Sequence, residues 1–101
     1  MWPKCVSKSD IEGVIAILMG HAPDDLASLS FHPDDPGPTL EEMFLCLTEG
    51  VNHVFRAPRY DDVRPKMLHL AGESYRLYSA GDSDGGFLAI DELHGVIYRT
   101  S

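Results

Sequence analysis

Apolar positions in the last third of the chain come in four short runs separated by turn-forming residues. Runs rich in Tyr, Phe, Ile and Val that are punctuated by Gly and Asp are typical of consecutive β-strands. Because the connections are too short for a crossover helix, we expect neighbouring strands to be antiparallel. The pattern predicts a four-stranded antiparallel meander over Lys66–Arg99. Its strands are Met67–Leu70, Tyr75–Ala80, Phe87–Ile90 and Val96–Tyr98.

The first part of the chain follows a helical period instead. Ser9 and Glu12 have the spacing of a capping box, in which each side chain bonds to the backbone of the other residue. Behind them, apolar residues recur at the i, i+3, i+4 spacing that places side chains on one helical face. This predicts a helix from about Asp10 to Met19. The apolar face consists of Ile11, Val14, Ile15, Leu18 and Met19.

A second helix is predicted from about Leu40 to Glu49. Thr39 and Glu42 form another capping box, and Met43, Phe44 and Leu47 lie on one helical stripe. Residues 51–55 fit either a short strand or an extension of this helix. Between the two helices, Pro23 predicts at most two further helical turns, and the proline-rich stretch 31–38 predicts a loop.

Together these elements predict an α+β protein that forms a single domain over residues 1–101, with both helices packed on one face of the meander. A chain of this length has room for one core. We expect five residues to lie in that core: Leu18, Phe44, Leu47, Leu77 and Ile90.

Composition adds a strong acidic bias. The chain has 8 basic and 16 acidic residues, which gives a formal net charge of −8. Such a surface repels nucleic acid and anionic membranes and attracts basic partners, although acidity also serves solubility alone. No apolar run approaches the ~18 residues of a membrane span, and the N-terminus has no signal-peptide pattern. We therefore expect a cytoplasmic protein with a protein partner, and no nucleic-acid or membrane partner.

No spacing of residues predicts catalysis, a cofactor or a metal site. The segment Asp82-Ser83-Asp84-Gly85-Gly86 begins like an EF-hand loop, but Phe87 and Leu93 occupy the positions that require Gly and a bidentate Glu. The five histidines lack metal-site spacing, and no Ser or Cys lies in a nucleophile motif. We expect no enzymatic activity.

Acidic residues beside aromatics in two predicted loops are candidates for binding a partner. Clustered carboxylates and aromatic side chains are what an inhibitor of a basic protein would present. We expect the loop after Arg59 and the hairpin tip at Asp82 to lie at the same edge of the sheet. The candidate partner-binding residues are Tyr60, Asp61, Asp62, Asp82 and Asp84.

The C-terminal pattern resembles the SUKH superfamily of immunity proteins. Members of that superfamily often have a strand, a Gly-Asp-x-x-Gly-Gly turn, a strand that ends in Leu/Ile-Asp, and then a Gly-Val-Tyr strand. Residues 77–91 and 95–98 are similar to this order, and residues 22–26 loosely resemble a segment near the superfamily's N-terminus. The resemblance implies an α+β protein that binds and occludes a cognate bacterial toxin, often a nuclease, without catalytic residues of its own.

An alternative is a small acidic secretion chaperone or adaptor that binds an extended segment of an effector on its sheet as a homodimer. Size, acidity and the combination of helices with a sheet fit this class. The predicted sheet has a partly apolar outer face, which would suit a dimer interface. A chaperone would be dimeric alone and bind unfolded segments, whereas an immunity protein would bind one folded toxin tightly.

Overall fold

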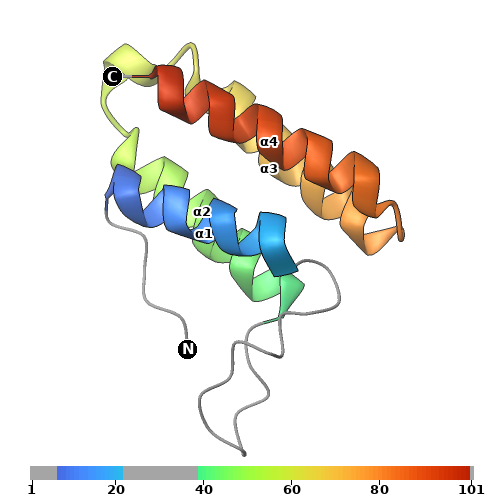
Figure 1. Cartoon of the computed structure of the whole chain (residues 1–101). Coiled ribbons are helices and arrows are strands. Elements are labelled where there is room, and N and C mark those ends of the chain that lie inside the picture. Colours follow the sequence, from blue (N-terminus) through green and yellow to red (C-terminus); the bar gives the residue numbers. More distant parts are fainter. Residues whose placement is uncertain (1–6, 22–38, 101) are drawn as a thin grey trace, which may run out of the picture.

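The computed structural model describes residues 7–21 and 39–100, and these form helices (Figure 1). The short helix expected after Pro23 and the loop expected over residues 31–38 lie outside the described residues. No helix in the described part of the chain is long and apolar enough to cross a membrane. The elements are α1 Lys8–His21, α2 Leu40–Val54, the 3₁₀ helix η2 Pro58–Tyr60, α3 Arg64–Ser79 and α4 Ser83–Arg99.

The four α-helices pack as a bundle in which consecutive helices run in opposite directions (Figure 1). Each helix packs against its neighbours in the chain, and α4 also packs against α1, which closes the bundle. The pairing of α3 with α4 is the most extensive. Where α1 begins and α4 ends, the ammonium of Lys8 donates a hydrogen bond to the carbonyl of Thr100 at 2.8 Å.

The prediction of α2 is confirmed. The Thr39 side chain accepts a hydrogen bond from the Glu42 amide at 3.1 Å, and the Glu42 carboxylate accepts one from the Thr39 amide at 3.2 Å. Residues 51–54 extend this helix, so the strand alternative is wrong. The helix predicted at residues 10–19 is also present, but it begins at Lys8. Ser7 and Asp10 make the reciprocal capping bonds there, in place of Ser9 and Glu12.

The predicted four-stranded meander is wrong, and with it the α+β fold class. The described residues contain no β-strand, and the segment from Arg64 to Arg99 forms the helical hairpin of α3 and α4. The buried positions show why. In α3 they follow the helical repeat: Met67, Leu70, Ala71, Ser74 and Tyr78.

Glycines misled the prediction because two of the three supposed turns lie inside helices, and the third is helical from Ser83 onward. Gly72 and Gly95 lie inside helices, and Gly85 and Gly86 lie in the first turn of α4. A glycine inside a helix costs only about 1 kcal/mol relative to Ala, which packing of an apolar face easily offsets. Only Gly81 makes a true turn, with a φ of 89°, at the reversal between α3 and α4.

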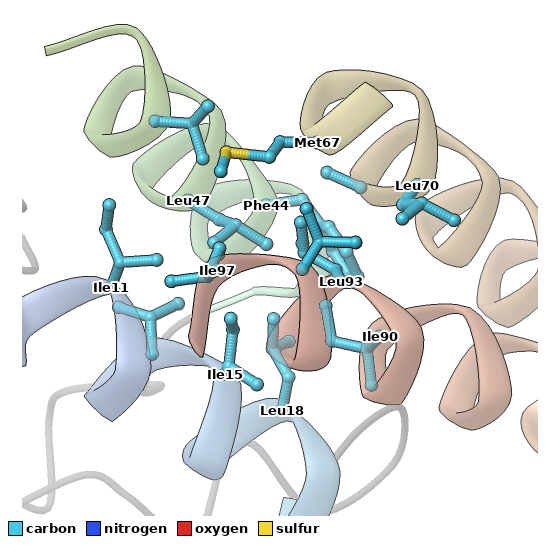
Figure 2. Close-up of a cluster of buried hydrophobic side chains, with 14 of the residues drawn as sticks. Ile11, Ile15, Leu18, Phe44, Leu47, Met67, Leu70, Ile90, Leu93 and Ile97 are labelled. Carbon is cyan, nitrogen blue, oxygen red and sulfur yellow. The ribbon is translucent and has the colours of Figure 1, made fainter. Parts of the chain in front are cut away.

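One apolar core joins all four helices (Figure 2). Ile15 and Leu18 from α1 and Ile90 and Ile97 from α4 lie with Leu47 of α2 in this cluster. The predictions that Leu18, Phe44, Leu47 and Ile90 are buried are confirmed. The prediction for Leu77 is wrong, because this residue lies at the edge of the buried stripe of α3 and is half-buried.

The residues that resemble the SUKH superfamily do not form its strands. Residues 77–79 end α3, residues 80–82 connect the two helices, and residues 83–91 and 95–98 belong to α4. The similar residues 22–26 lie outside the described residues. The α+β fold that the resemblance implied is therefore not the fold of the described residues.

Candidate partner-binding surface

Tyr60 lies in the core rather than on an open surface. It is only 9% exposed, and its ring meets that of Phe55 edge to face with 5.1 Å between centroids. The guanidinium of Arg59 covers the other part of the ring, 4.7 Å from its centroid, and donates a hydrogen bond to the Tyr60 hydroxyl at 2.6 Å. Tyr60 therefore serves first to pack the corner between α2 and α3.

The two acidic residues after Tyr60 differ in their surroundings. A carboxylate oxygen of Asp61 pairs with the Arg64 guanidinium at 2.6 Å, and the same guanidinium donates to the carbonyl of Phe55 at 2.8 Å. Asp61 thus helps to hold the arginine that closes the corner. Asp62 is exposed in the turn that leads into α3, and of the two it is the better placed to meet a partner.

Asp82 and Asp84 lie at the start of α4. Asp82 is the N-cap residue, and its carboxylate accepts a hydrogen bond from the Gly85 amide at 2.9 Å. Carboxylates at this position satisfy one of the unpaired amides of the first turn and meet the positive end of the helix dipole. Asp84 lies in that first turn, is exposed, and adds to the same effect.

The structure does not bring the two halves of the predicted site together. Asp61 and Asp62 precede α3, whereas Asp82 and Asp84 follow it. A helix of 16 residues is about 24 Å long at ~1.5 Å per residue. The expectation that both groups share one edge is therefore wrong. They lie at opposite ends of α3 and cannot form one compact patch.

Exposed apolar side chains gather elsewhere, on the side of α4 that faces away from the bundle. Of the four large exposed hydrophobic residues in the described part of the chain, Phe87, Leu88 and Tyr98 belong to α4 and only Leu45 to α2. Leu88 and Tyr98 are 67% and 73% exposed. We define the outer face of α4 as the residues that lie opposite its buried stripe at ~100° per residue: Asp84, Phe87, Leu88, Asp91, Glu92, Gly95, Tyr98 and Arg99.

This face combines apolar side chains with carboxylates. Asp84, Asp91 and Glu92 are exposed between and beside the apolar residues, and Arg99 is the only basic residue on the face. Arg99 folds back along its helix, so that a Cβ added to Gly95 would lie 3.3 Å from a guanidinium nitrogen. The face is therefore acidic over its first half, and the Arg99 side chain lies beside Gly95 in its second half.

Sequence reasoning included Asp84 but missed the rest of this face. It assigned Phe87 and Leu88 to one strand and Tyr98 to another, so their common orientation was not seen. A helical projection shows the signal, because Phe87, Asp91 and Tyr98 repeat at nearly whole helical turns. The buried positions of α4 repeat in the same way on its opposite side, at Gly86, Ile90, Leu93, Val96 and Ile97.

An exposed ion pair on α3 joins Arg76 to Glu73 at 2.6 Å, and the hydrogen bond from Arg76 lowers the pKa of the Glu73 carboxyl below its ordinary value. Within the residues described, no group of three His, Cys, Asp or Glu side chains is arranged to hold a metal ion.

Comparison with protein-family models, with curated proteins and with solved structures found no match for this chain. The candidate surface is therefore described only from the exposure and charge of its own residues.

Proposed function

We propose that this chain is an immunity-type protein that binds and occludes a basic protein, such as a bacterial toxin that acts on nucleic acid. The observation that supports the proposal is the excess of acidic over basic residues, a net charge of −8. A field of this sign raises the local concentration of a basic partner and speeds its encounter. Proteins that act on nucleic acid are commonly basic, because phosphate contacts dominate their affinity.

The placement of the basic residues supports this proposal. Arg56 donates to the carbonyl of His53 at 2.7 Å, Arg59 binds the Tyr60 ring and hydroxyl, and Arg64 binds Asp61 and the carbonyl of Phe55. These three arginines stabilise the corner between α2 and α3. Carboxylates such as Glu49 and Glu92 are exposed on other parts of the bundle, and Asp62 is exposed at the corner itself, so a basic partner can approach all three.

Occlusion requires binding and no chemistry by this chain. Apolar and aromatic side chains at the centre of an interface provide most of the affinity, whereas charges at its rim provide orientation and association rate. The chaperone alternative placed the partner's extended segment on a sheet, and residues 7–21 and 39–100 form none. No described feature favours that mode of binding.

The test is the association kinetics between the purified chain and the protein encoded by the adjacent gene, measured over a salt series. The Debye length falls from ~10 Å at 0.1 M salt to ~3 Å at 1 M, so we expect the association rate to fall steeply and the dissociation rate to change little. Inhibition of the partner's activity at a stoichiometric ratio should accompany binding. The proposal would be overturned if the chain bound neither the product of the adjacent gene nor any other folded basic protein.

A further inference from the structure

We propose that the outer face of α4 is the docking site for a basic amphipathic helix of the partner. This inference deepens the proposed function, because it names the surface and the partner element through which a basic protein would be bound. Three of the four large exposed apolar residues of the described chain lie on this face of α4, and the other three helices together contribute one. An unpartnered apolar face of this kind marks an interaction site.

The spacing of the apolar residues fits a helix as the partner element. Phe87 and Tyr98 are separated by about three helical turns, or ~16 Å, and Leu88 lies beside Phe87 on the same face. A helix laid along α4 would contact these residues with its own side chains at i, i+3, i+4 and i+7, the common mode for a helix in an apolar groove. Gly95 lies between Leu88 and Tyr98, and the Arg99 guanidinium folds back beside it, so a partner helix would contact the Arg99 side chain at this point.

The charges on the outer face of α4 favour a basic partner helix. Asp84, Asp91 and Glu92 accompany the apolar residues over the first half of the face, and Arg99 alone opposes them near its end. A partner helix with Lys or Arg beside its apolar stripe would pair with these carboxylates. A partner with Glu or Asp at the same positions would place like charges together, which costs affinity and suppresses wrong partners.

The same charges argue against a second copy of this chain as the occupant. In an isologous antiparallel pairing that brings Phe87 against Tyr98 of the other copy, the twofold axis passes near residues 92 and 93. Asp91 and Glu92 of both copies would then meet at the centre of the interface. A parallel pairing would place Asp84 and Asp91 against their own counterparts. Both arrangements oppose like charges, so a basic helix is the better occupant.

The experiment uses two synthetic helical peptides of about 18 residues, enough for five turns. Both have the same leucine stripe, but one has lysine on its flanks and the other has glutamate. Dissociation constants are measured with the full chain by fluorescence anisotropy, and the contact surface is mapped by NMR chemical shifts. We expect the lysine peptide to bind at least about 100-fold more tightly than the glutamate peptide, a difference of two decades in Kd.

Matched variants of this chain locate the binding surface. Leu88→Ser should weaken binding of the lysine peptide by about tenfold or more, the scale of a contributing interface residue. The control Leu45→Ser changes a leucine of similar exposure on α2, a helix that packs mainly against α1 and α3, and should leave binding unchanged. Asp91→Asn should weaken binding and flatten its salt dependence, whereas Glu49→Gln on α2 should not. Because all four side chains are exposed, the variants should fold normally.

Each contrary result has a distinct meaning. Equal effects of Leu88→Ser and Leu45→Ser, or chemical shift changes away from α4, would overturn the docking site. Equal affinity for both peptides, or no binding of the lysine peptide, would overturn the basic helix as the occupant. A dimer in sedimentation experiments that Leu88→Ser dissociates would show that a second copy covers the face. If the adjacent-gene product still binds Leu88→Ser with unchanged affinity, the proposed function stands and this inference fails.

Discussion

At the scale of single residues, the contact between Gly86 and Tyr78 sets how closely α3 and α4 approach each other. A Cβ added to Gly86 would lie 2.7 to 2.8 Å from ring atoms of Tyr78, and the Gly86 carbonyl accepts a hydrogen bond from the buried hydroxyl of Ser74 at 2.8 Å. Gly72, in contrast, has nothing within 4 Å of its Cβ position. Glycine is therefore required for close helix packing at residue 86, whereas residue 72 has room for a side chain.

We predict that Gly86→Ala lowers the free energy of unfolding by about 1–3 kcal/mol, because the methyl group overpacks the interface. Gly72→Ala should raise it by about 0.5–1 kcal/mol, since alanine favours the helix and meets no neighbour. Urea unfolding of both variants and the wild type measures these changes. Stabilisation by Gly86→Ala would show that α3 and α4 are farther apart than described.

Tyr78 also makes stability depend on alkaline pH. Burial raises the pKa of its hydroxyl above the ordinary value of 10.0, because the phenolate would lose its hydration. Below that pH the side chain is neutral in both states and its contribution to stability is complete. As the pH rises above 10.0, the unfolded chain releases the proton first, so the free energy of unfolding must fall.

Tyr78→Phe should therefore reduce the loss of stability between neutral and strongly alkaline pH. Tyr98→Phe is the control, because it removes the same hydroxyl from a largely exposed side chain. Urea unfolding at a series of alkaline pH values measures both. Identical pH profiles for the two variants would contradict the assignment of this effect to Tyr78.

At the scale of elements, Phe44 joins α2 to α3. Its ring centroid lies 5.4 Å from that of Tyr75 and 6.2 Å from that of Tyr78, with tilted planes at both contacts. Aromatic pairs in this geometry contribute to stability beyond the area they bury.

We predict that Phe44→Ala lowers the free energy of unfolding by about 3–5 kcal/mol. Leu45→Ala, at the adjacent exposed position, should change it by less than about 0.5 kcal/mol, and thermal or urea unfolding distinguishes the two.

At the scale of the whole molecule, the division between buried and exposed faces separates stability from binding. One core unites α1, α2, α3 and α4, and the outer face of α4 contributes none of the residues in that core. Substitutions on this face should therefore alter partner binding without unfolding the bundle. The charge of the chain acts at the same scale, because its field guides a basic partner before any contact forms.

The predictions that proved right depend on interactions within a few residues. The capping box of Thr39 and Glu42 closes over one helical turn, so it forms wherever α2 forms and marks its start in the sequence. The stripes of Ile11, Ile15 and Leu18 and of Met43, Phe44 and Leu47 follow one helical period without interruption. Charge is a sum over residues, so the acidic surface also follows from composition alone.

The fold of the C-terminal third and the geometry of the candidate site depended on tertiary contacts. Gly72, Gly86 and Gly95 favour turns locally, and they become helical because the apolar stripes of α3 and α4 are buried against each other and the rest of the bundle. Tyr60 was expected at a surface, but packing against Phe55 buries it. Composition and local spacing determined the acidity of this protein and its first two described helices. Only the packing of helices distant in sequence decided the helical hairpin of α3 and α4, the separation of Asp62 from Asp84, and the side of α4 that stays exposed. The reason is that a residue's neighbours across a core are absent from its local sequence.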